Sequence, residues 1–258
     1  MRKFFWCTLD ANVVRREELS AMTAKANPIP SVWARQREPE QPALSRAAIV
    51  REAIAMLDAE GIEQLSMRKL GAALNAGATS LYRHVATKDE LMELAVDEVV
   101  AEIEVPPADS PDWRAAVAET ARSFRATALR HPWVASVLGQ AGLAYLGPNL
   151  MSLSERLAAL FTTAGFPDPG GAIDVVLSYV IGMSTTEAAW LTTVARSGET
   201  EAGFIARLMP AAQQAAAGYD HLTESYATPL PDPARVRDTK FANGLDVILD
   251  GLALRLPR

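Results

Sequence analysis

The feature that most constrains this chain is a helix-start signal that occurs twice between residues 44 and 70. Leu44-Ser45 precedes Ile49, and Leu65-Ser66 precedes Leu70 with the same spacing. A serine at the N-cap accepts a hydrogen bond from a free N–H group of the first turn, and the apolar residues on either side pack together as a hydrophobic staple. The sequence therefore predicts two short helices that begin at these serines.

Each predicted helix has an apolar stripe and a stop signal. The first helix is expected to end at Gly61. The second helix is expected to face inward with Leu70, Ala73 and Leu74. It is followed by the turn Asn75-Ala76-Gly77, in which the glycine can adopt a positive φ.

The rest of the chain also has helical patterns. Leu81 and Val85 lie four residues apart in a short third helix, and the capping box Thr87-Lys88-Asp89-Glu90 starts a fourth helix that extends to about Ile103. Ser110-Pro111-Asp112 has the form of a helix start, with serine as the cap and proline at the first position. Sustained period-2 alternation is lacking, so the fold class is predicted to be all-α. The further predicted helices span residues 113–131, 133–141, 148–164, 171–196, 200–217 and 234–256.

Prolines divide this all-helical chain into three parts. Residues 1–44 contain four prolines and no sustained periodicity, which is typical of a largely disordered arm. Pro106 and Pro107 mark the next boundary. The expected organisation is an N-terminal three-helix domain at 45–104 and a larger helical domain at 105–258.

Composition excludes several classes of protein. The single cysteine, Cys7, cannot form an intramolecular disulfide or a cysteine-based zinc site, and it is consistent with a reducing cytoplasm. With only three histidines, no metal site or other cofactor is expected. The longest apolar helical run, Val175 to Thr186, has 12 residues, whereas spanning a bilayer takes about 20. A cytoplasmic protein that does not enter the membrane is therefore expected.

An enzyme is a poor match to this sequence. It contains no nucleophile elbow, no phosphate-binding glycine loop and no metal-ligand spacing. His131 is the one candidate for acid–base chemistry, and its position before Pro132 is more typical of the end of a helix. No catalytic residue is predicted.

The distribution of charge favours DNA binding. The formal net charge is −6, yet no acidic residue occurs between Ser66 and Lys88. Two short helices joined by a turn with glycine are the sequence form of a helix-turn-helix, whose second helix reads base edges in the major groove. On pattern alone, such a pair is equally typical of an interior helical pair. If the segment binds DNA, the candidate residues are Ala78, Thr79, Ser80, Tyr82, Arg83, His84 and Lys88.

The segment also resembles the DNA-binding domain of the tetracycline-repressor (TetR) family. The resemblance rests on Leu65 to Leu70, on Ser80-Leu81-Tyr82-Arg83-His84-Val85 and on Thr87 to Leu91, without gaps from about Ser45 to Val99. It implies that Ala78, Thr79 and Ser80 read bases, that Tyr82 and Lys88 bind phosphate, and that Ser66 and Arg68 meet the DNA backbone or an edge base. Residues 77–79 differ from the tetracycline repressor, so its operator sequence is not transferable.

The larger domain resembles the second domain of the tetracycline repressor. The resemblance covers Trp113 to His131 and the last predicted helix. It implies that this last helix and the helix at 171–196 form a four-helix bundle across a two-fold axis. The apolar stripe of the last helix would be exposed in a monomer, which favours a homodimer. An internal core helix is the alternative. The candidate interface residues are Phe241, Leu245, Ile248 and Leu252.

A small-molecule pocket with apolar walls and a few polar groups is expected in the same domain. Glu187 lies in a largely apolar helix, so it either faces the pocket or pairs with an arginine. Leu138 occupies the position of a magnesium-binding histidine in the tetracycline repressor, which argues against a metal-chelated tetracycline. The candidate ligand-binding residues are Trp113, Thr120, Phe124, Trp133, Leu138, Tyr145, Phe161, Tyr179, Met183, Glu187 and Trp190.

These observations predict a dimeric transcriptional repressor that binds double-stranded operator DNA and is released from it by a small hydrophobic effector. The alternative is a helical small-molecule-binding protein without DNA recognition.

Overall fold

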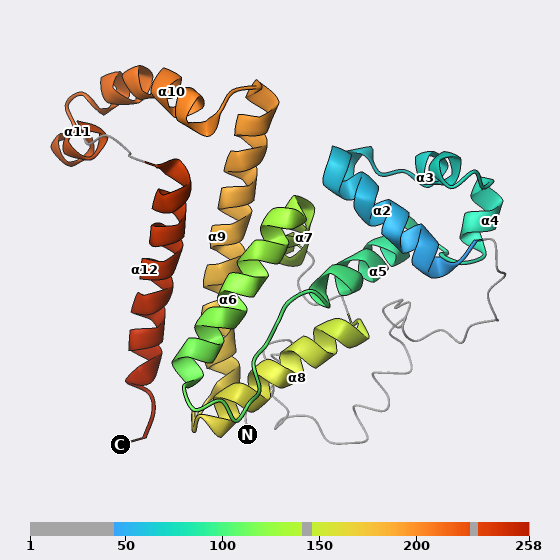
Figure 1. The fold of residues 1–258 in the computed structure, drawn as a ribbon, viewed down its shortest axis with the longest axis horizontal. Helices are drawn as coiled ribbons and strands as arrows, with labels where there is room; N and C mark the ends of the chain where they lie inside the picture. Colours follow the sequence, from blue (N-terminus) through green and yellow to red (C-terminus); the bar gives the residue numbers. More distant parts are fainter. Residues whose placement is uncertain (1–43, 141–145, 228–231, 258) are drawn as a thin grey trace, which may run out of the picture.

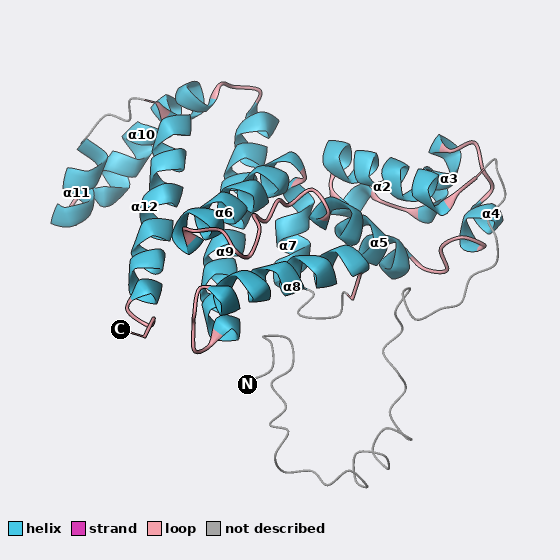
Figure 2. Cartoon of the chain, turned by 60° about the horizontal axis from the view of Figure 1, so that its bottom comes forward, coloured by secondary structure: helices cyan, strands magenta, loops and turns pink. Residues whose placement is uncertain are grey.

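A computed structural model of the chain describes residues 44–140, 146–227 and 232–257 (Figure 1). Every regular element in these ranges is helical, as Figure 2 shows, which confirms the predicted all-α class. None of the described helices has the length and apolar character needed to cross a membrane. The elements are α2 (Arg46–Glu60), the 3₁₀ turn η2 (Ile62–Gln64), α3 (Met67–Ala73), α4 (Ala78–Tyr82), α5 (Lys88–Val100), α6 (Trp113–Arg130), α7 (Pro132–Gln140), α8 (Pro148–Thr163), α9 (Pro169–Ser197), α10 (Glu201–Ala216), α11 (Asp220–Ala227) and α12 (Pro233–Ala253).

Helices α2 to α5 form an N-terminal unit at one end of the molecule (Figure 1). Its helices begin where the sequence predicts, because Ser45, Ser66 and Thr87 each accept a hydrogen bond from a backbone N–H group three residues ahead. Fully buried apolar residues from all four helices, including Ile49 and Leu91, form the core beneath them. The predicted arm of residues 1–44 lies outside the described residues except for Leu44.

The turn between α3 and α4 differs from the prediction. The positive φ, 50°, belongs to Asn75, whereas Gly77 has φ −67° and is the N-cap of α4. Asparagine tolerates the left-handed region better than most residues, so it can end α3 without a glycine. The expected inward position of Ala73 was also wrong. Each helical residue advances by about 100°, so the buried face set by Leu70 and Gly71 leaves Ala73 in solvent.

Helices α6 to α12 form the C-terminal domain, in which α9 is central because it packs against α6, α7, α8, α10 and α12 (Figure 1). The predicted apolar stripe of α6 is buried from Val117 to His131. Its start was predicted wrongly. Asp112 is the N-cap and accepts from the N–H of Ala115, whereas the hydroxyl of Ser110 donates to the carbonyl of Pro107.

Other predicted helices in this domain agree with the structure to within three residues at each end. Helix α11 was not predicted. It packs against α10, and the two form a hairpin that projects from the top of α9 (Figures 1 and 2). Gly198 permits the turn into this hairpin because it takes a φ of 72°, which favours glycine. The hairpin exposes large apolar side chains: Leu208, Tyr219, Leu222 and Tyr226.

Candidate DNA interface and effector cavity

Helix α4 lies on the outer edge of the N-terminal unit (Figure 1). Leu81 and Val85 are fully buried and hold the helix against the unit from beneath. Thr79, Ser80 and Tyr82 therefore face outward, and Tyr82 is 49% exposed. Exposed polar side chains on a short helix with a buried apolar face are the arrangement that a recognition helix requires. Ala78 is the first residue of α4.

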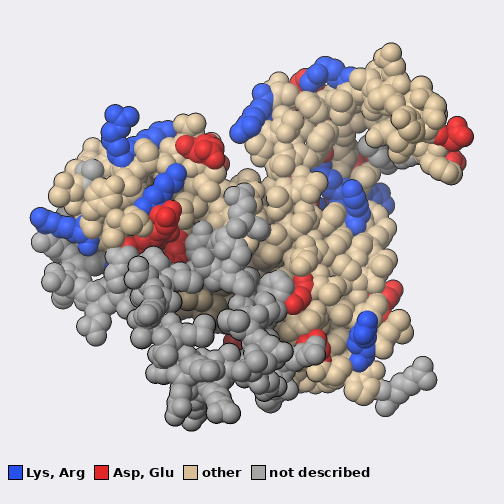
Figure 3. Space-filling view, turned by 180° about the vertical axis from the view of Figure 1, so that it is seen from behind, with Lys and Arg blue, Asp and Glu red and all other residues tan. Residues whose placement is uncertain are grey.

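Basic groups surround α4. The side chains of Arg68, Arg83 and Lys88 are exposed, and Figure 3 shows Lys and Arg gathered over the end of the molecule that the N-terminal unit forms. Within the part of the chain that the structure describes, the Nζ of Lys88 makes one long contact, 3.5 Å, with the carbonyl of Ile62. Lys69 is instead engaged in an ion pair with Glu60. The surface thus presents cations that can meet phosphate groups.

Two further side chains shape this surface. The hydroxyl of Ser66 is exposed but is already the cap of α3, where it accepts from the N–H of Lys69. His84 is partly exposed, and its carbonyl accepts a hydrogen bond from the Nε of Arg46 at 3.3 Å. Arg46 thereby holds the backbone that follows α4. Sequence reasoning missed this residue because its partner lies 38 residues away.

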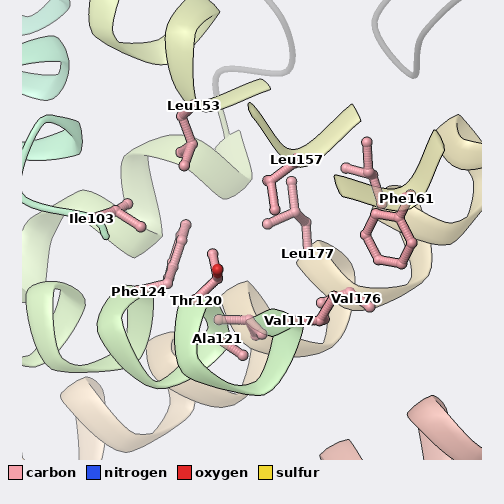
Figure 4. Close-up of a pocket in the computed structure, with 12 residues that line it drawn as sticks. Ile103, Val117, Thr120, Ala121, Phe124, Leu153, Leu157, Phe161, Val176 and Leu177 are labelled. Atoms are coloured by element: carbon pink, nitrogen blue, oxygen red, sulfur yellow. The ribbon is translucent and has the colours of Figure 1, made fainter. Parts of the chain in front are cut away.

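An apolar cavity lies between α6, α8 and α9 (Figure 4). The space open to the centre of a water molecule is about 10 Å³, which is room for about one water. Thr120 is the one polar residue of the lining, and its hydroxyl donates to the carbonyl of Ala116. The cavity is lined by Ile103, Val117, Thr120, Ala121, Phe124, Leu153, Leu157, Phe161, Ile173, Val176, Leu177 and Val180.

The predicted ligand-binding residues are only partly brought together. Thr120, Phe124 and Phe161 line the cavity. Trp113 lies behind its wall, with its ring 4.9 Å from that of Phe166 in an edge-to-face contact. Leu138 and Met183 pack against the core but do not line the cavity. Tyr145 lies outside the described residues.

Three predicted aromatic residues are placed elsewhere because their polar atoms bind groups of the same chain. The Nε1 of Trp133 donates to Asp58 at 2.7 Å, and the Nε1 of Trp190 donates to Glu201 at 2.6 Å. The hydroxyl of Tyr179 donates to the carbonyl of Phe241 at 2.8 Å. None of these three side chains lines the cavity between α6, α8 and α9.

Glu187 also lies outside the cavity lining, in a buried ion-pair network. Arg125 donates to both of its carboxylate oxygens at 2.6 Å, and Arg237 donates to one of them at 2.9 Å. The hydrogen bond to Glu187, opposed by burial, raises the pKa of Arg125. Of the two predicted alternatives for Glu187, pairing with arginine is the observed one.

A second polar cluster joins the N-terminal unit to the C-terminal domain. His131 ends α6, as expected, and its Nδ1 lies 2.8 Å from Asp58 on α2. Its Nε2 lies 3.4 Å from Glu102, which also receives a hydrogen bond from Arg130 at 2.6 Å. Burial alone raises the pKa of Glu102, but Arg130 and His131 lower it overall. These polar contacts tie the two parts of the molecule together.

The predicted apolar stripe of α12 packs largely against its own chain. Phe241 and Leu245 are 2% and 3% exposed and pack toward α9. These two residues therefore agree with the alternative prediction of an internal core helix. Ile248 and Leu252 are only partly buried. Val247, on another side of α12, is 71% exposed.

Comparisons with known proteins agree with both parts of the structure. Residues 49–95 match the family model described as bacterial regulatory proteins, tetR family. Residues 105–256 match the model described as the tetracyclin repressor-like C-terminal domain. The two matches together cover more than half of the chain.

Full-length relatives and solved structures extend this likeness. The chain is 34% identical to the HTH-type transcriptional repressor DrrR1 of Streptomyces coeruleorubidus, over 86% of the chain and 83% of the relative. It is 30% identical to the class A tetracycline repressor of Escherichia coli, over 80% and 89%. Apo ActR from Streptomyces coelicolor has a similar structure, with a TM-score of 0.67 and 30% identity, over 83% of this chain and 96% of that one. The chain therefore belongs to the TetR family of DNA-binding transcriptional regulators, which are not enzymes.

Proposed function

We propose that this chain acts in the cytoplasm as a homodimeric repressor, which binds operator DNA through α4 and is released by a small apolar effector. The observation that carries the proposal is the placement of α4, whose polar residues face solvent over the fully buried Leu81 and Val85. Recognition helices of a dimer must lie about 34–36 Å apart to enter successive major grooves. The alternative, a ligand-binding protein without DNA recognition, does not account for this exposed polar helix.

The groups proposed to bind DNA divide by chemistry. Ala78, Thr79 and Ser80 begin α4, where small side chains allow a close approach to base edges. Tyr82 and Lys88 are proposed to bind phosphate groups. Such contacts set affinity and register on the duplex but carry little sequence information. Further backbone contacts are assigned to Ser66, Arg68, Arg83 and His84.

Exposed apolar surface supports the homodimer. The outer face of α12 exposes Val247, and Leu254 just beyond it is 86% exposed. Helix α9 exposes Val175 and Gly182, and the α10–α11 hairpin exposes further large apolar residues. A monomer rarely leaves so much apolar surface in water, and a two-fold partner would cover the same patches on both chains. Ile248 and Leu252 border this surface and are proposed to contribute to it.

The cavity indicates the kind of effector. Its lining is apolar apart from Thr120, whose hydroxyl is already bonded, so an uncharged and largely apolar molecule fits its chemistry. One solved relative, ActR, was determined in complex with actinorhodin, with a TM-score of 0.66 and 31% identity. In the described residues no cluster of metal-ligating side chains occurs. These observations support an effector that needs no metal.

The test is operator binding by two variants, Tyr82→Ala and Lys88→Ala. DNA from upstream of the protein's own gene is labelled, and binding is followed by fluorescence anisotropy. Each variant should weaken binding by about 10- to 100-fold, and Lys88→Ala should also reduce the salt dependence by about one phosphate contact. Arg122→Ala removes an exposed cation from α6 and is the matched control. Equal affinity of all three variants and the unaltered protein contradicts the proposal.

A further inference from the structure

The N-terminal end of α8 is capped by a side chain from another helix. Gly147 is the N-cap of α8 and has no side chain to offer. Asp97 of α5 takes this role: its carboxylate accepts from the N–H of Leu150 at 2.9 Å and from the N–H of Asn149 at 3.3 Å. The Nδ2 of Asn149 adds a third hydrogen bond to this carboxylate, at 3.0 Å. The cap that positions α8 therefore belongs to α5.

The contact between α5 and α8 is close and buried. Asp97 is 3% exposed, and a Cβ on Gly147 would overlap with its carboxylate. The backbone carbonyl of Asp97 accepts a further hydrogen bond from Asn149 at 3.2 Å. Burial raises the pKa of Asp97, although the bonds from Leu150 and Asn149 oppose this effect. Breaking the contact would leave buried polar groups unpaired, which is costly, so the two helix segments are expected to move together.

Helix α8 is also a wall of the effector cavity. Leu153, Leu157 and Phe161 point into it from α8 (Figure 4). Because the cavity has room for about one water, any larger molecule must displace a wall. Helix α9 packs against five other helices, whereas the main packing partners of α8 are α9 and α5. Displacement of α8 is therefore a way to open the cavity that leaves the central helix α9 in place.

We propose that Asp97 is a positioning residue that transmits displacement of α8 to α5 and hence to the DNA-reading surface. The residue touches neither the cavity nor the proposed DNA contacts. Helix α5 begins at Lys88, one of the proposed phosphate contacts, and α2 packs against it. A shift of α5 thus moves the reading surface of one protomer relative to the other. This inference rests on the proposed function, because it assumes an operator and an effector cavity.

A substitution that enlarges a side chain inside the cavity replaces the unidentified effector in the test. Ala121 is 2% exposed and lines the cavity from α6. Ala121→Phe should push α8 outward and weaken operator binding by about tenfold. Asp97→Asn keeps one acceptor oxygen but places an NH₂ group against the donors of Asn149, so it weakens the cap. In the double variant, the loss caused by Ala121→Phe should fall to about threefold or less.

Matched controls separate this effect from loss of stability. Ala188→Phe overpacks a buried site on α9 outside the cavity lining, so it should destabilise the fold without weakening operator binding. Ala121→Leu replaces Ala121→Phe if circular dichroism shows the larger variant unfolded. Asp97→Asn alone should bind the operator to within about threefold of the unaltered protein, because α4 and its contacts are intact.

Three outcomes overturn the inference. If Ala121→Phe weakens operator binding equally in the unaltered and in the Asp97→Asn backgrounds, displacement of α8 reaches the DNA-reading surface by another route. Unchanged affinity of a folded Ala121→Phe shows that displacement of the wall does not reach the reading surface. An equal loss from Ala188→Phe shows that affinity follows stability alone. Failure of the unaltered protein to bind the operator is a distinct result, because it removes the proposed function itself.

Discussion

The N-terminal unit and the C-terminal domain both have local helix caps but differ in the range of their longest side-chain contacts. In the N-terminal unit, the caps at Ser45, Ser66 and Thr87 join residues three apart, and the contact of Arg46 with His84 spans 38 residues. In the C-terminal domain, Arg125 and Glu187 lie 62 residues apart, and Arg125 and Asp238 lie 113 apart. Local caps stabilise each helix by itself, whereas the long-range contacts fix helices relative to each other. Loss of a long-range ion pair is therefore expected to cost more than loss of a cap.

The largest effect is expected from Glu187→Ala. Arg125 and Glu187 have side-chain exposures of 13% and 7%, so removal of the carboxylate leaves Arg125 charged and buried. The free energy of unfolding should fall by about 3 kcal/mol, as measured by urea denaturation. The exposed pair Glu199–Arg207 is the control, since Glu199→Ala should cost less than about 0.5 kcal/mol. Equal effects of the two substitutions would contradict the assignment of Glu187 to a buried network.

Two glycines sharpen the comparison, because Gly77 and Gly147 are both helix N-caps with nearly the same conformation, φ −67° and φ −64°. A Cβ on Gly147 would overlap with Asp97, whereas a Cβ on Gly77 would meet open space. Gly147→Ala should therefore lower the free energy of unfolding by about 2 kcal/mol. Gly77→Ala should cost less than about 1 kcal/mol. Thermal denaturation of both variants measures the difference, and similar costs would exclude the close contact between α5 and α8.

Local caps are expected to contribute equally in both domains. Ser45→Ala and Asp112→Ala each remove a side-chain cap and should each cost about 1 kcal/mol in urea denaturation. Ser110→Ala should cost clearly less, because Ser110 is not the cap of α6. A larger cost for Ser110→Ala than for Asp112→Ala would show that Ser110 is the cap of α6, as the sequence predicts.

The smallest effect concerns pH at the junction of the two domains. Since Arg130 and His131 lower the pKa of Glu102 against the effect of burial, the folded chain binds that proton less tightly than the unfolded chain. The stabilisation is present above the ordinary glutamate pKa, about 4.3, and is lost as the pH falls through the lowered value. Denaturation between about pH 5 and pH 3.5 measures this loss. Glu102→Gln should have a flatter pH dependence, and an unchanged profile would show that Glu102 contributes nothing.

The separation in sequence between contacting residues also explains which features of the fold and the site could be predicted. Helix starts at Ser45, Ser66 and Thr87 follow from neighbouring residues, so they were predicted correctly, and so was the outward-facing segment that begins at Thr79. Of the residues of α6 that line the cavity, Thr120 and Phe124 were predicted because a helical stripe places them on one face, whereas Val117 and Ala121 were not predicted. Periodicity therefore predicts which face of a helix is buried.

Periodicity does not predict which partner a buried side chain meets. Trp133, Tyr179 and Trp190 were expected in the pocket, but their polar atoms bind groups on other helices. The role of Asp97 has no signal in the sequence, because its partners on α8 are more than 50 residues away. On α12, the stripe from Phe241 to Leu252 has the same pattern whether it faces α9 or a second chain.

The most direct test of the account is the stoichiometry of the protein on its own upstream DNA. Analytical ultracentrifugation with labelled duplex, at low salt, measures how many chains bind one site. The account predicts two chains per site, with an affinity that falls steeply as salt rises. A stable single-chain species in solution, or a dimer that leaves the duplex free at low salt, would contradict it.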